Sequence, residues 1–583
     1  MTAPGPSGLA GGPPARASFA KRYGPLIGIV VVIVLVAVVV TISSRGNDDV
    51  AATSPTGSTV AGGSLPVTYD EAKQAGNAGS VNWGDDCDTT TGAIKLPSVY
   101  APACVPAFSG SNGGATAPGV TADTITVVYY NPALGSDLTA LVGSQIDAPE
   151  LVDQTIKGYQ DLFNSVFETY GRKVVIKRYD AKAAMSDTVG AAADAQAVID
   201  QFHPFASING PVLTSAYSDE LTRNGVACFN CGLALPDSAF QEQAPHMWVN
   251  LATPEQFLQI VSDYVQKRLI NRPAEYAGGD LQGKPRTFGV VHFESDPPAF
   301  QGVSEQMLKC GAQVGWSPIV NEEYGFDLGK MPERATTIVA KLKAANVTTV
   351  VFLGDPLMPI FLTKAATAQG YFPEWVVTGT PYTDSASLAR KYDPEQWKRA
   401  FGLSQLPVRL PQDQLSSWRI YEWAYGRAPE AVNTNPLLMA PIQQIFTGVH
   451  LAGPNLTPDT FRDALFRAEP AGGGPTTIHV SYGDHGYFKT LNPDTCQYEG
   501  AAPDYASTDD MTEIWWDAQA TGPDEQGKEG QGLYFYANGG KRYLPRQMPD
   551  TPPDAFKTDG AISGMDRPAP DETPPTYPKP TIG

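Results

Sequence analysis

Apolar and polar positions follow two different periodicities along most of this chain. Residues 124–130 are a run of apolar and β-branched residues that ends at Asn131 and Pro132, which predicts a buried strand followed by a turn. From residue 150 to residue 170, apolar side chains recur every three or four positions, which predicts one face of a helix. Residues 173–179 again have the pattern of a strand. Together these segments predict a strand–helix–strand unit of a parallel sheet.

The same alternation continues through two successive blocks. A polar, Gly-rich loop at residues 277–284 separates the blocks, and the long helix before it is predicted at residues 253–271. Residues 476–544 contain more aromatic residues and glycine, which favours β structure. Two successive blocks of this kind imply two α/β lobes. The further strands are predicted at residues 206–209, 226–230, 287–293, 314–319, 348–353 and 374–378, and near 478–482, 513–516 and 532–536 in the final third. The further helices are predicted at residues 188–202, 214–224, 303–310, 333–345, 357–369, 415–425, 435–451 and 460–467.

An almost unbroken apolar run at residues 26–42 precedes the lobes. With residues 23–25 it reaches the roughly 20 residues that span a bilayer. Basic residues without acids stand before the run and two aspartates follow it, so residues 1–24 are predicted to be a cytosolic tail. A cleaved signal peptide is the alternative, but the run is longer than a typical signal core and no clear cleavage site follows. We therefore expect residues 25–42 to form a single transmembrane helix at the cell membrane, with the bulk of the chain extracytoplasmic.

Changes in composition mark the other boundaries. Residues 43–80 are rich in Ser, Thr, Gly and Ala without periodicity, which predicts a flexible linker. Residues 81–118 hold Cys87 and Cys104 among Pro and Gly, and their simplest interpretation is a small extension closed by one disulfide. Residues 546–583 are dominated by Pro and Asp, which predicts a disordered tail. The lobes themselves therefore occupy residues 119–545.

All six cysteines follow the apolar run, which fits an oxidising compartment with up to three disulfides. Cys228 and Cys231 have the spacing of a redox motif, but Cys228 falls in a predicted strand and not at a helix N-terminus that would activate a thiol. A structural role, in one local bridge or two longer ones, is favoured. Cys310 and Cys496 could join the second block to the final third, and spacing alone does not fix the connectivity.

Charge and motifs exclude several function classes. The formal net charge of −20 argues against nucleic-acid binding. Residues 278–284 have the spacing of a phosphate-binding loop, but Pro285 stands where Ser or Thr should hold magnesium. The histidines lack zinc-helix spacing and no nucleophile elbow occurs, so we expect no catalytic residues, no metal and no cofactor. His479 is interpreted as a surface or packing residue, and the acid pair Asp509 and Asp510 as a solvated turn.

Ligands of open parallel sheets bind beyond the carboxyl ends of the strands. In the first block these ends carry Asn131, Thr214 and Ser215, and the last two stand at a helix start where hydroxyls and free N–H groups could hold an anion or carboxylate. In the second block they carry acids and aromatics, among them Asp355 and Tyr382. This combination suits a small polar ligand between the lobes, although each residue alone could be a helix cap or a turn residue.

Six segments together carry a resemblance to a known family. In chain order they are GVTADTITVVYYNPALG, GYQDLFNSV, GRKVVIKRYDAKAA, FASINGPVLTSAYSDELTRNGVACF, RTFGVVHFES and KLKAANVTTVVFLGD. The chain resembles the type I periplasmic-binding-protein fold, and more closely the branched-chain amino acid (Leu/Ile/Val) substrate-binding proteins of ABC transporters. The likeness covers residues 119 to about 453 and is weaker beyond.

The resemblance implies an α/β fold with two Rossmann-like lobes joined by three crossovers, in which the ligand is trapped when the hinge closes. Lobe 1 would comprise about residues 119–252 and 385–450, and lobe 2 about residues 253–384 and 451–545. The family's second-lobe acid and aromatic are not at their expected places, near Pro381 and Asp355, although Tyr382 and Asp384 stand close by. Amides, aromatic acids and other small carboxylates are therefore as suitable as an α-amino acid. The ligand-binding set predicted from the strand ends and the resemblance together is Asn131, Leu213, Thr214, Ser215, Gly232, Leu233, Asp355, Tyr382 and Asp384.

These observations favour a membrane-anchored extracytoplasmic solute-binding protein of an ABC importer, not an enzyme. Its partners would be a small-molecule ligand, the transporter permease and the membrane. The alternative is an extracellular sensor or surface interaction module that reuses the same fold, which the tether, the extra cysteines and the Pro-rich tail would suit. An enzyme that uses Cys228 and Cys231 in disulfide chemistry is disfavoured by the absence of an activating helix N-terminus.

Overall fold

The computed structural model of the chain describes most residues beyond position 64. The described ranges are 65–133, 147–184, 187–211, 214–232, 235–294, 305, 309–311, 317–325, 327–380, 382–492, 494–500 and 504–582. The predicted cytosolic tail, the predicted transmembrane helix and positions 43–64 of the predicted linker lie outside them. Within the described ranges, no helix combines the length and the apolar character needed to cross a bilayer.

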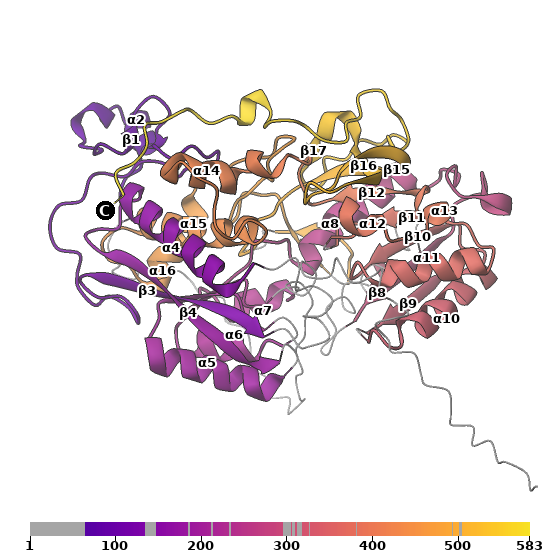
Figure 1. The fold of residues 1–583 in the computed structure, drawn as a ribbon, viewed down its shortest axis with the longest axis horizontal. Coiled ribbons are helices and arrows are strands. Elements are labelled where there is room, and N and C mark those ends of the chain that lie inside the picture. The colour runs from indigo at the N-terminus through magenta and orange to yellow at the C-terminus, as the bar shows by residue number, and fades with distance from the viewer. Residues whose placement is uncertain are drawn as a thin grey trace, which may run out of the picture.

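The first lobe is built on a parallel sheet of strand order β4-β3-β5-β6-β7. Helices on both sides cover this sheet, and they come from two separate parts of the chain (Figure 1). The strands are β3 (Thr124–Ala133), β4 (Lys173–Ala184), β5 (Ala206–Ile208), β6 (Ala227–Phe229) and β7 (Met247–Trp248). The helices are α4 (Pro149–Val166), α5 (Thr188–Phe202), α6 (Ala216–Arg223), α7 (Asp237–Glu242), α14 (Ser416–Tyr425), α15 (Asn435–Ala452) and α16 (Pro458–Arg467).

The predicted strand–helix–strand unit at the start of this lobe is confirmed. In β3, the side chains of Ile125, Val127 and Val128 are fully buried, as expected for a strand that helices cover on both faces. The apolar stripe of α4 includes Tyr159 and Phe163, which pack against aromatic rings of α14 and α15. The apolar face of α4 that the three-to-four spacing predicts is therefore the face against which α14 and α15 pack.

The second lobe is built on a mixed sheet of strand order β16-β15-β12-β11-β10-β8-β9, with β17 paired to β15. Strands β8 to β12 run parallel to one another, and β15 is antiparallel to β12. The strands are β8 (Phe288–Phe293), β9 (Val320–Tyr324), β10 (Thr349–Leu353), β11 (Glu374–Val377), β12 (Ala400–Ser404), β15 (Met511–Pro523), β16 (Glu529–Tyr536) and β17 (Arg542–Tyr543). The helices are α8 (Pro254–Tyr264), α10 (Met331–Ala344), α11 (Met358–Ala368), α12 (Ala386–Ala389) and α13 (Pro394–Trp397).

Two of the predicted lobe boundaries are wrong. Strand β12 extends lobe 2 to residue 404, whereas lobe 1 was expected to resume at residue 385. Helix α16 packs its Phe461 ring against Phe205 and Trp248 of lobe 1, whereas lobe 2 was expected from residue 451. Strand β12 escaped prediction because it contains Gly402, where a Cβ would lie 1.9 Å from the carbonyl oxygen of Val377 on β11. The close approach of the β12 and β11 backbones therefore requires glycine at position 402, and glycine weakens the sequence pattern that predicts a strand.

Before the C-terminal segment that starts at residue 545, the described chain crosses between the lobes in three segments, at residues 249–253, 405–415 and 468–510. Two of them are joined by backbone hydrogen bonds: Val249 N–H donates to Tyr505 O at 3.0 Å, and Ser507 N–H donates to Val249 O at 3.0 Å. Ser481 N–H donates to Ser507 O at 3.2 Å within the third segment. We call these three segments the hinge. Two α/β lobes, one with a parallel and one with a mixed sheet, joined by three crossings, are the fold that the resemblance implies, so this part of the prediction is confirmed.

The N-terminal part of the described chain is folded against lobe 1. Helix α2 (Tyr69–Gln74) starts with a capping box between Thr68 and Glu71, so the predicted flexible linker is wrong for residues 65–80. Short strands β1 (Cys87–Asp88) and β2 (Ala93–Ile94) follow, and a disulfide joins Cys87 to Cys104 as expected. The other described disulfides join Cys228 to Cys231 and Cys310 to Cys496. Cys228 and Cys231 thus form the local bridge, which was one of the two arrangements left open.

The Pro-rich tail is held along its whole described length, so its predicted disorder is wrong. Tyr536 N–H donates to Ile562 O at 2.8 Å, and Tyr577 Oη donates to Asp88 Oδ2 at 3.1 Å. Frequent proline prevents regular helices and central strands, but it does not prevent fixation by scattered side-chain and backbone contacts. In Figure 1 the tail is the yellow trace that runs from the second lobe to the N-terminal extension.

His450 makes the attachment of the N-terminal extension sensitive to pH. Its ring is 2% exposed, Glu168 N–H donates to its Nδ1 at 2.9 Å, and Nε2 lies 3.0 Å from Ala103 O. Burial lowers the pKa of His450 to about 4. The unfolded chain binds a proton below about pH 6.5 and the folded chain does not, so we expect the free energy of unfolding to fall by about 3 kcal/mol as the pH drops from about 6.5 to about 4.

We expect His450→Gln to remove this part of the pH dependence. The measurement is the free energy of unfolding at several pH values between 4 and 7 for wild type and variant. His203→Gln is the matched control, because His203 is exposed, and it should keep the wild-type slope. Equal slopes for wild type and His450→Gln would refute the assignment, whatever the variant does to stability at pH 7.

Candidate functional site

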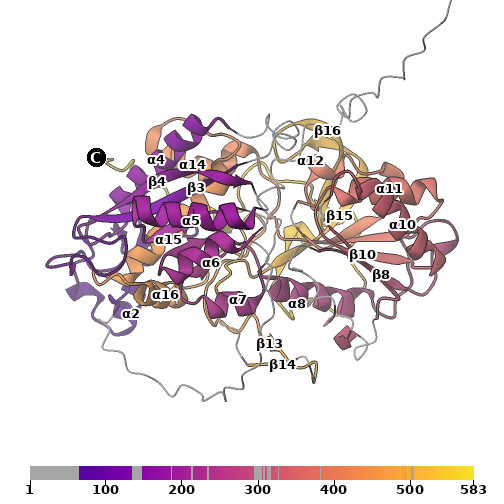
Figure 2. The same cartoon turned by 90° about the horizontal axis from the view of Figure 1, so that it is seen from below.

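The two sheets lie on either side of the hinge, as two perpendicular views show (Figures 1 and 2). In lobe 1, Thr214 and Ser215 stand directly before α6, as predicted, and each is 4% exposed. Their hydroxyls have partners within the lobe: Thr214 Oγ1 accepts from Ala216 N–H at 3.2 Å, and Ser215 Oγ donates to Asp219 Oδ2 at 2.7 Å. The two residues therefore shape the loop after β5, and a ligand would have to compete for these hydroxyls.

The other described lobe-1 candidates stand at neighbouring strand ends. Asn131 Nδ2 donates to Asp180 Oδ1 at 2.8 Å, which links the ends of β3 and β4. Gly232 follows the Cys228–Cys231 bridge after β6 and is buried. The predicted candidates Leu213 and Leu233 lie outside the described residues. The described members of the set therefore occupy the ends of β3, β5 and β6, which are the positions that the strand order makes adjacent.

Asp355 has a structural role at the start of α11. Its Oδ1 accepts from the N–H groups of Leu357 and Met358 at 2.8 and 3.1 Å, and Tyr324 Oη donates to its Oδ2 at 2.6 Å. Burial raises the pKa of Asp355, and these donors oppose that rise. Both carboxylate oxygens are thus committed to protein donors, which is the helix-capping alternative considered for this position.

Asp384 differs, because only one of its two carboxylate oxygens has a donor in the described part of the chain. The residue is 2% exposed, and Ser404 Oγ donates to its Oδ2 at 2.6 Å. Among the described atoms, its buried Oδ1 has no hydrogen-bond partner. Burial raises the pKa of Asp384 to about 6. Tyr382 stands two residues earlier with φ of 59°, and desolvation raises its pKa as well.

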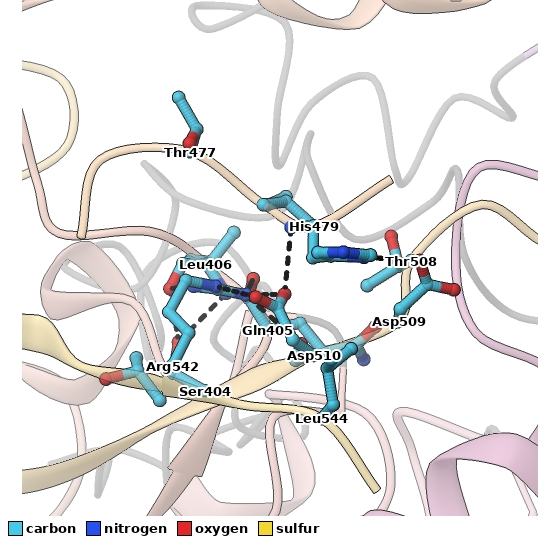
Figure 3. Close-up of polar contacts among 12 residues, drawn as sticks. Ser404, Gln405, Leu406, Thr477, His479, Thr508, Asp509, Asp510, Arg542 and Leu544 are labelled. Carbon is cyan, nitrogen blue, oxygen red and sulfur yellow. Dashed lines mark hydrogen bonds and ion pairs between the residues drawn. The ribbon is translucent and has the colours of Figure 1, made fainter. Parts of the chain in front are cut away.

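A second polar group lies at the hinge and was not predicted (Figure 3). Arg542 is centred between the crossing segments: Nη2 and Nε donate to both oxygens of Asp510, at 2.8 and 2.9 Å. Its Nη1 and Nη2 also donate to the carbonyl oxygens of Leu406 and Gln405, at 3.0 and 2.9 Å. The backbone N–H of His479 donates to Asp510 Oδ1 at 3.1 Å. One guanidinium therefore joins the end of β12, the start of β15 and the third crossing.

Next to this ion pair, Asp509 is fully buried. His479 Nδ1 lies 2.7 Å from Asp509 Oδ2, and Ser481 Oγ donates to the same oxygen at 2.7 Å. Burial raises the pKa of Asp509 to about 6. The interpretation of Asp509 and Asp510 as a solvated turn is wrong. His479 packs its ring against Tyr487, as a packing residue would, and it is also a polar partner of Asp509. The expectation that neighbouring acids lie in a solvent-exposed turn fails here, because the segment of His479 and Ser481 and the side chain of Arg542 cover both carboxylates.

Buried oxygen atoms without partners collect around the hinge. In the described part of the chain they include Oδ1 of Asp384, Asn250 and Asp509, and Oε1 of Gln405. Asn250 follows β7, Gln405 follows β12, and Asp509 precedes β15, so all three belong to crossing segments. A buried acceptor without a donor costs free energy, so this junction is suited to a group that brings N–H or O–H donors. The described residues contain no group of three or more His, Cys, Asp or Glu side chains that could hold a metal ion.

Sequence comparisons add no relative, since no protein-family model matches the chain and no curated protein is detectably similar to it. Several solved structures are similar in fold at low sequence identity. A fatty acid ABC transporter substrate-binding protein from Thermomonospora curvata is 15% identical, with a TM-score of 0.45 over 73% of this chain and 95% of that chain. The leucine-, isoleucine-, valine-, threonine- and alanine-binding protein from Brucella ovis is 14% identical, with a TM-score of 0.44 over 76% and 100%.

An amino acid ABC transporter substrate-binding protein from Pseudomonas fluorescens Pf-5 is 12% identical, with a TM-score of 0.46 over 70% of this chain and 95% of that chain. Similarity at this level assigns neither a ligand nor a site residue to this chain. The fold class rests instead on its own strand orders and on the three crossing segments.

Proposed function

We propose that this chain is an extracytoplasmic solute-binding protein that delivers a small polar ligand to an ABC importer. The observation that supports this most is the two-lobed α/β architecture with three crossings, in which the described candidates stand at strand ends. Parallel sheets bind ligands at these ends, and two lobes on a hinge can enclose one. The N-terminal apolar run would hold the protein at the membrane beside the permease.

In this proposal the lobes contribute different groups. Thr214, Ser215 and the N-terminus of α6 would meet a carboxylate or another acceptor of the ligand. Asp384 Oδ1 and Gln405 Oε1 would accept from N–H or O–H groups of the ligand, because both are buried and lack a described protein donor. Closure would be driven by contacts that exist only when both lobes touch the ligand. Amino acids, amides and hydroxy acids carry both kinds of group.

A thermal-shift screen of the full chain against amino acids, amides, small carboxylates and sugars tests the proposal. A ligand that binds only the folded state adds about 2.7 kcal/mol of stability at a hundredfold excess over its dissociation constant. We expect a hit whose shift is reduced in Asp384→Asn and retained in Asp327→Asn, since Asp327 is an exposed acid of the same lobe. No shift across the library would count against solute binding and favour a sensor or surface interaction module.

The pH dependence of a hit provides a further check on Asp384. A carboxyl group with a pKa of about 6 is ionised at pH 7.5 and largely protonated at pH 5. A cationic ligand should therefore lose affinity as the pH falls through 6, and Asp384→Asn should show a weaker dependence. Equal pH profiles for wild type and variant would remove Asp384 from the proposed site.

A further inference from the structure

The C-terminal segment of the described chain, residues 545–582, is anchored first on lobe 2. Asp554 Oδ2 accepts from Arg268 Nη2 at 2.8 Å, and the Phe556 ring packs 4.7 Å from the Tyr276 ring, measured between centroids. Ile562 then pairs with Tyr536 of β16 through two backbone hydrogen bonds, at 2.8 and 3.1 Å. Up to this point the segment is an additional layer on the second sheet.

The same segment next passes over two hinge segments. Met565 N–H donates to Arg409 O at 2.9 Å in the second crossing. Glu572, which is 7% exposed, then binds the third crossing: its Oε2 accepts from Thr476 N–H at 2.8 Å and from Thr476 Oγ1 at 2.6 Å. Thr477 Oγ1 donates to the other carboxylate oxygen. Gly474 makes room for this contact, because a Cβ there would lie 2.4 Å from Glu572 Oε1.

The segment ends on lobe 1 and on the N-terminal extension. Trp423 Nε1 donates to Tyr577 O at 2.9 Å, and Tyr577 Oη donates to Asp88 Oδ2 at 3.1 Å. The side chain of Ile582 packs against the lobe-1 core. Figure 1 shows the trace passing from β16 and β17 over the hinge to α2. One continuous piece of chain is therefore fixed to lobe 2, to the hinge and to lobe 1.

Few residues separate successive anchors. Residues 566–571 lie between Met565 and Glu572, and residues 573–576 lie between Glu572 and Tyr577. A short 3-10 helix at Pro570–Glu572 and six prolines in residues 566–582 restrict the backbone of this segment. Rotation of one lobe against the other changes the distance between Ile562 and Tyr577. A connection that is attached at such short intervals cannot follow such a change unless an anchor detaches. The prolines are Pro568, Pro570, Pro574, Pro575, Pro578 and Pro580.

We propose that residues 562–582 form a strap that limits the rotation of the lobes about the hinge, with Glu572 as its central attachment. The strap holds the lobes near the inter-lobe angle of this structure. Release of Glu572 frees the span between Ile562 and Tyr577, and the lobes then sample a wider range of angles. This role requires no ligand, so it stands apart from solute binding.

The distance between the lobes tests this proposal directly. Lys157 on α4 and Lys330 before α10 have side chains that are 70% and 81% exposed, and all six native cysteines are in disulfides. Lys157→Cys and Lys330→Cys therefore give two label sites for pulsed electron-paramagnetic-resonance distance measurements on the full chain. We expect Glu572→Ala to broaden the distance distribution about twofold, as a released hinge should.

Two further variants make the result decisive. Asp571→Ala is the matched control, because Asp571 is the exposed neighbour of Glu572, and it should keep the narrow distribution. The double variant Glu572→Ala/Tyr577→Ala removes two attachments and should broaden the distribution further. Hydrogen exchange should rise at residues 566–582 in both strap variants while the sheet cores stay protected. An unchanged width in both strap variants would overturn the proposal, whether or not a ligand is ever found.

Discussion

Replacing Asp510 with asparagine is expected to lower the free energy of unfolding by about 3–5 kcal/mol, because it leaves a buried guanidinium without its counter-charge. Arg542 and Asp510 have side chains that are 1% and 2% exposed. The amide introduced by Asp510→Asn could still accept one hydrogen bond but would carry no charge. The measurement is chemical denaturation of wild type and variant, followed by tryptophan fluorescence.

The control for this result is an exposed ion pair with a similar N–O distance but a single contact. Asp459 Oδ1 lies 2.9 Å from Arg462 Nη1, and its side chain is 70% exposed. Asp459→Asn should cost less than about 1 kcal/mol, because solvent screens such pairs. If the two variants lost the same stability, the hinge ion pair would have no special role. A loss of unfolding free energy confined to Asp510→Asn would show that the ion pair between Arg542 and Asp510 stabilises the hinge.

Arg268→Met should have an effect of the same size, about 3–5 kcal/mol, in the body of lobe 2. Arg268 on the continuation of α8 is fully buried and pairs with Glu513 of β15, whose side chain is 1% exposed, and with Asp554 of the C-terminal segment. The substitution leaves the buried Glu513 without its counter-charge. Burial already raises the pKa of Glu513 despite the arginine beside it.

The sign of the pH effect distinguishes an unpaired charge from a packing defect. Once Arg268 is gone, the pKa of Glu513 rises further, so protonation should relieve part of the damage as the pH falls from 7 to 5. The double variant Arg268→Met/Glu513→Gln should recover part of the loss at pH 7, and its stability should depend less on pH. Arg223→Met, at an exposed pair with Glu220, serves as control. A loss in Arg268→Met that neither low pH nor the second substitution relieves would indicate packing instead.

Local patterns in the sequence were sufficient to predict most helices and strands, but they were not sufficient to assign each of them to one lobe or the other. The runs that became β3, β8 and β10 are continuous and apolar because helices bury both faces of these strands. Nothing local distinguishes a strand of one parallel sheet from a strand of the other. The chain leaves lobe 2 after β12 and returns to it at β15, and these crossings occur in short irregular segments whose composition resembles that of any loop.

The site could be predicted only in part for a related reason. Strand ends can be read from a sequence, so Asn131, Thr214 and Ser215 could be named as candidates, and they stay predictions. Asp384 became a candidate only through the resemblance to a known family. The hinge network could not be found in this way, because Arg542, Asp510 and Gln405 are far apart in sequence and acquire their burial only when the crossings pack together. The prediction of a disordered C-terminal tail was wrong for a different reason. A high proline content indicates that a segment forms no regular helix or strand, but it does not indicate that the segment lacks contacts with the rest of the protein.

The Cys310–Cys496 disulfide encloses a stretch of chain that visits both lobes, from β9 to β12 in lobe 2 and through α14, α15 and α16 in lobe 1. Because the stretch lies inside a covalent ring, one peptide-bond cleavage anywhere within it leaves a single molecule. A protease that nicks an exposed turn in this ring would release no fragment until the disulfide is reduced. Cleavage of this kind would therefore open the ring while the two lobes stay covalently joined.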